Sequence, residues 1–164
     1  MSPASAPDLL ESLIRLLVAT AIGGLIGLNR EITQKPAGLR THSLVSLGSA
    51  LMTVTALLLS GGNPSLHVDA TARVIQGMIA GIGFIGGGVI LHRDGRDVKG
   101  LTTAATLWVA AALGVSCGIG HWQLALGAVT VALLVLVIGR PLETALHRAV
   151  PPKPDKPDTG GRQG

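Results

Sequence analysis

The sequence predicts an all-α integral membrane protein: a compact bundle of five transmembrane helices with the N-terminus outside the cell and the C-terminus in the cytoplasm. Three observations carry this prediction. Charged residues make up only 13% of the chain, about half the usual quarter, so a soluble domain of this size would lack a wettable surface. The apolar residues fall into runs of nearly membrane-spanning length, and the basic residues collect in alternate gaps between those runs. A mean hydropathy of +0.54 also excludes a disordered chain.

Each apolar run is close to the roughly 20 residues that cross a bilayer core. The first is a retained span rather than a cleaved signal, because it is preceded by acidic instead of basic residues and continues past the only cleavage-like sequence. Ser and Thr in the second and fourth runs are tolerated in a membrane helix. The last two runs are joined by only four residues, which predicts a tight hairpin. We take the spans as residues 9–28, 44–60, 74–91, 101–118 and 123–138.

The positions of the basic residues predict the orientation. Eleven of the 13 lysines and arginines lie after the first, third or fifth span, and the positive-inside rule places those segments in the cytoplasm. Residues 1–8 would then be a short periplasmic N-terminus and residues 9–140 the transmembrane domain. Residues 141–164 would be a cytoplasmic juxtamembrane segment with a disordered, proline-rich tail. The cations flank spans and have no interleaved aromatic side chains, so nucleic acid is excluded as a partner.

The third span is rich in glycine. Its sequence GIGFIG at 81–86 matches a dinucleotide-binding pattern, but a site of that kind needs a preceding strand, and these glycines lie inside a lipid-length helix. Glycines four residues apart instead let a neighbouring helix approach closely. We therefore expect the third span to be the central packing helix, with the alternative that its glycines let it bend or line a polar cleft. The glycines predicted to pack helices are Gly23, Gly27, Gly77, Gly87, Gly114 and Gly118, and the motif glycines are Gly81, Gly83 and Gly86.

The second span carries polar residues on one helical face, namely His42, Ser46, Ser49 and Thr53. One interpretation is that these side chains form hydrogen bonds between helices. The other is that they face a hydrated pocket that opens to the cytoplasm, where the histidine would titrate.

The ends of the spans hold the remaining candidate residues. Asp69 and Arg73 stand one helical turn apart and predict a local ion pair. With Gln76 they would organise the outer end of the third span. Thr102 or Thr103 would cap the fourth helix. The cytoplasmic loops contribute a predicted interaction face that contains Arg30, Glu31, Lys35, Pro36, Gly38, Arg40, Thr41, His42, Lys99, Gly100, Thr102 and Thr103.

Catalytic and metal-binding patterns are missing from the sequence. No Asp or Glu lies deep within a span, although cation pathways usually contain an intramembrane carboxylate. The sequence has no P-loop, no H-E-x-x-H pair and no evident Ser/His/Asp set. It has one cysteine, which excludes an internal disulfide and a multi-cysteine zinc site. We expect no enzyme activity, no bound metal and no cofactor.

Four segments together resemble the membrane domain of the bacterial MgtC/SapB family over about residues 10–140. They are GLIGLNRE at 24–31, KPAGLRTH at 35–42, RVIQG with GIGFIGGG between 73 and 88, and KGLTTAATLW at 99–108. The resemblance implies a multi-pass protein of the bacterial inner membrane, associated with Mg²⁺ limitation and, in some members, with survival inside host cells. It further implies regulation of other membrane machinery, such as the F-type ATP synthase or a transporter, rather than Mg²⁺ transport in its own right.

Two features depart from that family pattern. Asn29 stands where members commonly have an acidic residue, and many members carry a soluble cytoplasmic domain that we do not expect here. We expect a non-enzymatic accessory or regulatory protein in low-Mg²⁺ adaptation and envelope ion homeostasis. Its partners would be the lipid bilayer, other inner-membrane proteins and, as a homo-oligomer, further copies of itself. The alternative is a small oligomeric transporter or channel for Mg²⁺ or another solute.

The predicted orientation is tested with reporter fusions. Alkaline phosphatase, which is active only outside the cytoplasm, should be inactive when fused after Arg148 and active when inserted at His121. The reverse result would overturn the orientation, because it would place the basic segments outside the cell.

Overall fold

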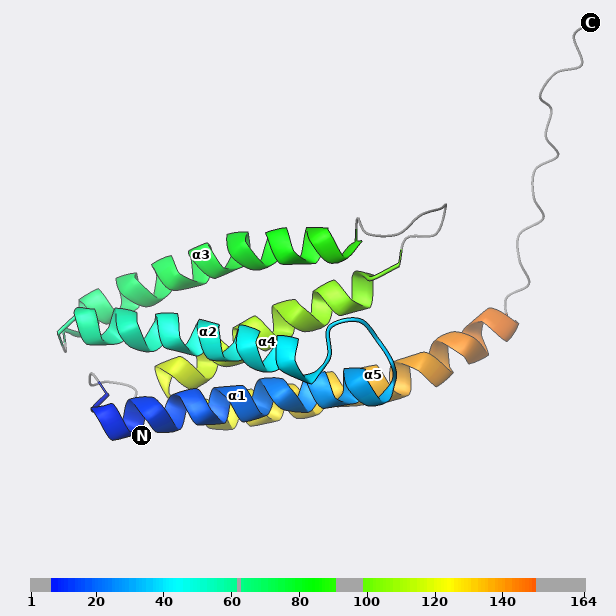
Figure 1. The fold of residues 1–164 in the computed structure, drawn as a ribbon, viewed down its shortest axis with the longest axis horizontal. Helices are drawn as coiled ribbons and strands as arrows, with labels where there is room; N and C mark the ends of the chain where they lie inside the picture. The colour runs from blue at the N-terminus through cyan, green and yellow to red at the C-terminus, as the bar shows by residue number, and fades with distance from the viewer. Residues whose placement is uncertain (1–6, 62, 91–98, 150–164) are drawn as a thin grey trace, which may run out of the picture. The chain divides into compact units, whose positions relative to one another are not determined.

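A computed structural model describes residues 7–61, 63–90 and 99–149, and its regular structure there is entirely helical. The chain forms α1 (Leu9–Ile32), α2 (Leu39–Leu59), α3 (Pro64–Ile90), α4 (Leu101–Ile119) and α5 (Trp122–Ala149) (Figure 1). All five are long and apolar enough to cross a membrane. The all-helical class and the five spans are therefore confirmed, while the direction of insertion remains a prediction.

The helices extend beyond several of the expected spans. α3 begins at Pro64, ten residues before the expected start, because a helix can continue through polar residues once it leaves the hydrocarbon. α5 likewise continues to Ala149 and contains Pro141. Part of the segment expected as a juxtamembrane region and tail is thus helical, and residues 150–164 lie outside the described residues. The chain divides into a unit of residues Met1–Leu133 and a second unit, Leu134–Gly164, that begins within α5.

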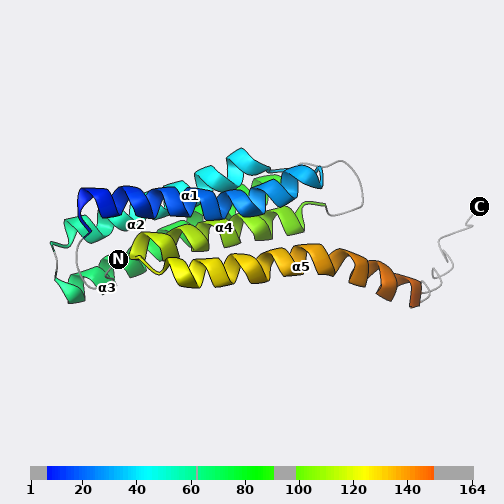
Figure 2. The same cartoon turned by 90° about the horizontal axis from the view of Figure 1, so that it is seen from below.

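α2 is the central helix of the first unit. It contacts α1, α3 and α4, and α1, α2 and α4 lie side by side in both views (Figures 1 and 2). The expectation that the third span is the central packing helix is wrong. The reason is steric, because the close backbone approaches at glycines inside the described helices all involve α2, and the further one, at Gly100, lies just before α4.

Two glycines of α1 let α2 approach its backbone. A Cβ atom added at Gly23 would lie 2.7 Å from the carbonyl oxygen of His42, and one at Gly27 would lie 2.7 Å from the Cα of Leu39. Real Cβ contacts are essentially never so short, and backbone atoms cannot move aside cheaply. Only glycine therefore fits at these positions while the two helices keep this separation.

Two glycines of α4 play the same part on the other side of α2. A Cβ atom at Gly114 would lie 2.7 Å from the Cβ of Ser49, and one at Gly118 would lie 2.9 Å from the carbonyl oxygen of Ala50. The partners on α2 are themselves small residues. Small side chains of α2 thus face glycine on the α4 side, and on the α1 side glycine faces Ser46 and the backbones of His42 and Leu39.

The glycines of α3 have a different environment. At most of them a Cβ atom would meet nothing within 4 Å in the described part of the chain, and the exception, Gly86, would touch only the Cβ of Ala104 at 3.4 Å. The expectation that Gly77 and Gly87 pack against another helix of the same chain is therefore wrong. The open positions on α3 are Gly77, Gly81, Gly83, Gly87 and Gly88.

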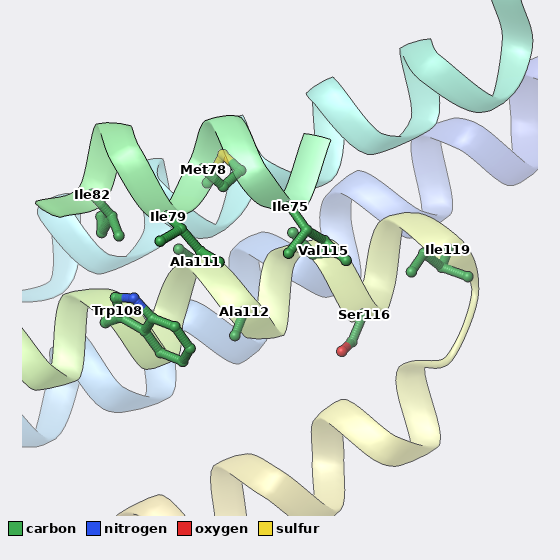
Figure 3. Close-up of a pocket in the computed structure, with 10 residues that line it drawn as sticks. All are labelled: Ile75, Met78, Ile79, Ile82, Trp108, Ala111, Ala112, Val115, Ser116 and Ile119. Atoms are coloured by element: carbon green, nitrogen blue, oxygen red, sulfur yellow. The ribbon is translucent and has the colours of Figure 1, made fainter. Parts of the chain in front are cut away.

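α3 packs on α4 through larger apolar side chains. Ile82 lies in a buried cluster with Leu107 and Ala111. Next to this cluster, aliphatic side chains of α3 face Trp108 and the alanines of α4 across a cavity of about 260 Å³ (Figure 3). This contact is looser than the glycine contacts of α2.

A matched pair of substitutions tests the steric role of glycine. Gly27→Ala should destabilise the protein by about 1–3 kcal/mol, because the added methyl group overlaps the backbone of α2. Gly83→Ala adds the same group at an open position and should change stability by less than about 1 kcal/mol. Thermal unfolding in detergent measures both, and equal stabilities would contradict the packing described here.

Candidate functional site

The predicted cytoplasmic ends of α1 and α4 are joined by a buried arginine. Arg30, in the last turn of α1, is only 5% exposed. Its Nη2 donates a hydrogen bond of 2.7 Å to Oγ1 of Thr103, which is also buried. A hydrogen bond to a charged group is stronger than a neutral one. Arg30 therefore links α1 to α4 inside the bundle. The expectation that it belongs to an exposed interaction face is wrong, because it is buried.

His42 brings the start of α2 into the same cluster. Its Nδ1 lies 3.0 Å from the carbonyl oxygen of Gly38, and its Nε2 lies 3.0 Å from Oγ1 of Thr106. The Thr106 hydroxyl also lies 2.9 Å from the carbonyl oxygen of Thr103. Side chains of α1, α2 and α4 thus meet at one buried polar cluster, which consists of Arg30, His42, Thr103 and Thr106.

The number of hydrogens in this cluster limits its bonding. A carbonyl oxygen only accepts, so His42 carries a hydrogen on Nδ1 and donates it to Gly38. With a neutral ring, the single hydroxyl hydrogen of Thr106 goes either to Nε2 or to the carbonyl of Thr103. A doubly protonated ring donates through Nε2 as well, and the hydroxyl is then available to Thr103. The hydrogen bond between His42 of α2 and Thr106 of α4 can therefore form in either ring state, but with a neutral ring it takes the Thr106 hydroxyl hydrogen away from the Thr103 carbonyl.

The loop between α1 and α2 is held in a defined conformation. The backbone N–H of Leu39 donates to Oε2 of Glu31 at 3.2 Å, so a carboxylate caps the first turn of α2. Gly38 lies directly against this carboxylate. Gln34 and Ala37 both have positive φ, at 53° and 57°, which is uncommon for residues with side chains. Such a backbone persists only where its surroundings determine it.

Gly100 begins α4 with a φ of 98°, a conformation that favours glycine. It has no side-chain cap, so the expectation that Thr102 or Thr103 caps this helix is wrong. Thr103 instead accepts from Arg30, and Thr102 is exposed. The loop residues 91–98 lie outside the described residues. The exposed residues of the predicted interaction face are Glu31, Lys35, Pro36, Arg40, Thr41, Lys99 and Thr102.

The polar face of α2 is closed to water. Ser46, Ser49 and Thr53 are at most 1% exposed. Ser46 donates across to the carbonyl oxygen of Ala19 on α1 at 2.7 Å, whereas the other two donate to carbonyls of their own helix. The interpretation that these side chains form hydrogen bonds between helices is therefore right for Ser46 and His42 but not for Ser49 and Thr53. The interpretation that they face a hydrated pocket is wrong, because they are buried. The small polar side chains are there because the helices approach too closely for larger ones.

A second buried arginine lies at the opposite end of the bundle, and sequence reasoning did not single it out. Arg15 on α1 is fully buried. Its Nη1 donates to the carbonyl oxygen of Gly118 at 2.7 Å, and its Nη2 pairs with Glu11 at 2.8 Å. The guanidinium thus satisfies a carbonyl in the last turn of α4. The sequence did hold an indication of this role: Arg15 lies one helical turn after Glu11, on the predicted outer side of the membrane, where few basic residues are expected.

The outer end of α3 carries the predicted ion pair. Nε of Arg73 lies 2.9 Å from Oδ2 of Asp69, and both side chains are mostly exposed. Gln76 is exposed one turn further on. Among the described residues, no group of three or more His, Cys, Asp or Glu side chains is placed to hold a metal ion.

Comparison with known proteins identifies relatives of this chain. The model of the MgtC family matches residues 16–145. Protein SrpB of Synechococcus elongatus is 46% identical over 129 residues, covering 74% of this chain and 71% of that protein. Protein MgtC of Salmonella typhimurium is 40% identical over 128 residues, and protein MgtC of Brucella abortus is 41% identical over 129. The matches cover 78% and 79% of this chain, which spans about half of each MgtC protein, 52% and 51%. No solved structure matches.

Adjacent threonines test the buried polar cluster. Thr103→Val removes the acceptor of Arg30 while keeping the shape of the side chain, and should cost about 1–3 kcal/mol because a buried guanidinium donor loses its partner. Thr102→Val is the exposed control and should change stability by less than about 0.5 kcal/mol. Thermal unfolding in detergent compares the two, and an unchanged Thr103→Val protein would refute the role given to Arg30.

Proposed function

The chain belongs to the MgtC family, and from this premise we propose that it is a non-enzymatic regulatory protein of a bacterial inner membrane. It would act in adaptation to low Mg²⁺ and in envelope ion homeostasis. It would do so by binding another membrane protein, such as the F-type ATP synthase or a transporter, rather than by moving ions itself.

The observation that carries this proposal is the burial of the polar face of α2. Its residues are covered by α1 and α4, and glycines of those two helices lie directly against α2. A conducting path needs polar groups that line water. Here the buried polar side chains of α2 bond either to a neighbouring helix, as Ser46 and His42 do, or to carbonyls of α2 itself, which favours a rigid scaffold over a pathway through this chain.

The predicted cytoplasmic face of this scaffold carries exposed cations beside a fixed loop. The buried polar cluster fixes the ends of α1, α2 and α4, and the loop beside it is capped by Glu31. Lys35 and Arg40 project from this fixed frame as exposed cations. Cations held on a rigid loop suit an acidic surface of a protein partner. We therefore place the interaction face on the exposed loop residues and assign its buried neighbours a positioning role.

The first experiment separates regulation from transport. Purified protein in proteoliposomes should show no Mg²⁺ flux above that of empty vesicles, since the polar face of α2 is buried in the described part of the chain. Flux that Ser46→Leu or Gly83→Leu abolishes would refute the proposal and establish the transporter.

The second experiment tests the interaction face. In a deletion strain grown at limiting Mg²⁺, the Lys35→Ala, Arg40→Ala double variant should lose most of the complementing activity and the co-purifying membrane partner. Exchanging the two residues, as Lys35→Arg with Arg40→Lys, keeps the charge and should retain both. Full activity of the double alanine variant, at equal membrane abundance, would exclude this face.

A further inference from the structure

A long apolar groove lies between α2 and α3. Its volume is about 1010 Å³, and aliphatic and methionine side chains from both helices line it. On α3 the lining runs from Arg73 to Ile85, which is about 18 Å along a helix at about 1.5 Å per residue. One leaflet contributes half of the roughly 30 Å hydrocarbon core. On α2 the lining runs from Leu44 to Leu59, which is about 22 Å by the same rise per residue. The groove is thus longer than one leaflet but shorter than the whole hydrocarbon core.

Glycines form the floor of this groove. Gly48 of α2 and both Gly77 and Gly81 of α3 line it, and a Cβ atom at any of them would meet nothing within 4 Å in the described part of the chain. Larger side chains such as Met52, which is 59% exposed, stand beside them. The result is a slot between apolar walls that suits a flexible hydrocarbon chain.

Among the residues that line the groove, the charged one stands at one end. Arg73 lines it there and pairs through Nε with Asp69, one turn earlier. A guanidinium has five N–H donors and a carboxylate has two acceptor oxygens, so one bond between them leaves donors and acceptors for a ligand. The side chains are 76% and 60% exposed, which makes both reachable. The cavity between α3 and α4 has no such charged end (Figure 3).

We propose that this groove binds one phospholipid with a phosphoethanolamine headgroup, in the leaflet where α3 begins. The phosphate accepts hydrogen bonds from Arg73, the ammonium donates to Asp69, and an acyl chain lies over Gly77 and Gly81. The adjacent opposite charges match a zwitterionic headgroup better than a purely anionic one. A transmembrane helix from a second copy would need a groove along the whole core of roughly 30 Å, whereas this one is about 18 Å long on α3 and about 22 Å long on α2, which is closer to the length of an acyl chain.

Native mass spectrometry of the purified full chain tests the proposal. The detergent-solubilised protein is titrated separately with phosphatidylethanolamine, phosphatidylglycerol and phosphatidylcholine. We expect one phosphatidylethanolamine to be retained per chain. It should bind about tenfold more tightly than phosphatidylcholine, whose quaternary ammonium has no N–H to donate to Asp69. Equal retention of all three lipids, or a dimer that excludes lipid, would overturn the assignment.

Variants locate the site on the protein. Asp69→Asn should remove the preference for phosphatidylethanolamine over phosphatidylcholine, and Arg73→Gln should weaken all three lipids by about tenfold. Gly81→Leu fills the groove and should abolish retention, while Gly83→Leu, on the same helix but outside the groove, should retain lipid as the unaltered chain does. Equal retention by the two leucine variants would place the lipid elsewhere and refute the proposal. Each variant is first shown to keep the unaltered thermal stability, or is replaced by the alanine substitution at the same position.

Discussion

The structure depends on the close approach of α2 to α1 and α4. In lipid there is no hydrophobic gain from bringing two apolar helices together, so association relies on dispersion contacts and hydrogen bonds, both of which need short distances. Gly23 and Gly27 on one side and Gly114 and Gly118 on the other supply those distances. The burial of Ser46, Ser49 and Thr53 in α2 follows from this, because only small side chains fit where the backbones approach.

The same closeness explains how two arginines are accommodated. Arg15 and Arg30 stand on α1 about 22 Å apart at 1.5 Å per residue, and each binds α4, at Gly118 and at Thr103 respectively. A higher residue number on α1 meets a lower one on α4, so the two helices are antiparallel. A charged group near the membrane is costly unless it is bonded. The hydrogen bonds from Arg15 to Gly118 and from Arg30 to Thr103 therefore hold α1 and α4 together near both ends and fix the register between them.

α3 contrasts with this tightly packed group. Its contacts with α2 and α4 use larger side chains and leave a groove and a cavity, and most of its glycines have no neighbour in the described part of the chain. A helix that is glycine-rich without close packing has room for something other than its own chain. The rigid trio of α1, α2 and α4 would then position the cytoplasmic surface, and α3 would adapt to the lipid around it.

The sequence by itself determined the class of protein, the number of helices and the family. Length and hydropathy are properties of single segments, and a run of about 20 apolar residues has few other options than to cross a membrane as a helix. It also identified the ion pair at Asp69 and Arg73, because residues one turn apart meet whatever the tertiary structure. Which glycines pack was decided only in three dimensions. Glycine pairs with the same spacing occur on α1, α3 and α4, and nothing in a spacing says which one faces another backbone. The burial of Arg30 and Arg15 likewise depended on partners 73 and 103 residues away, and a basic residue at the end of a span looks the same in sequence whether it reaches water or another helix.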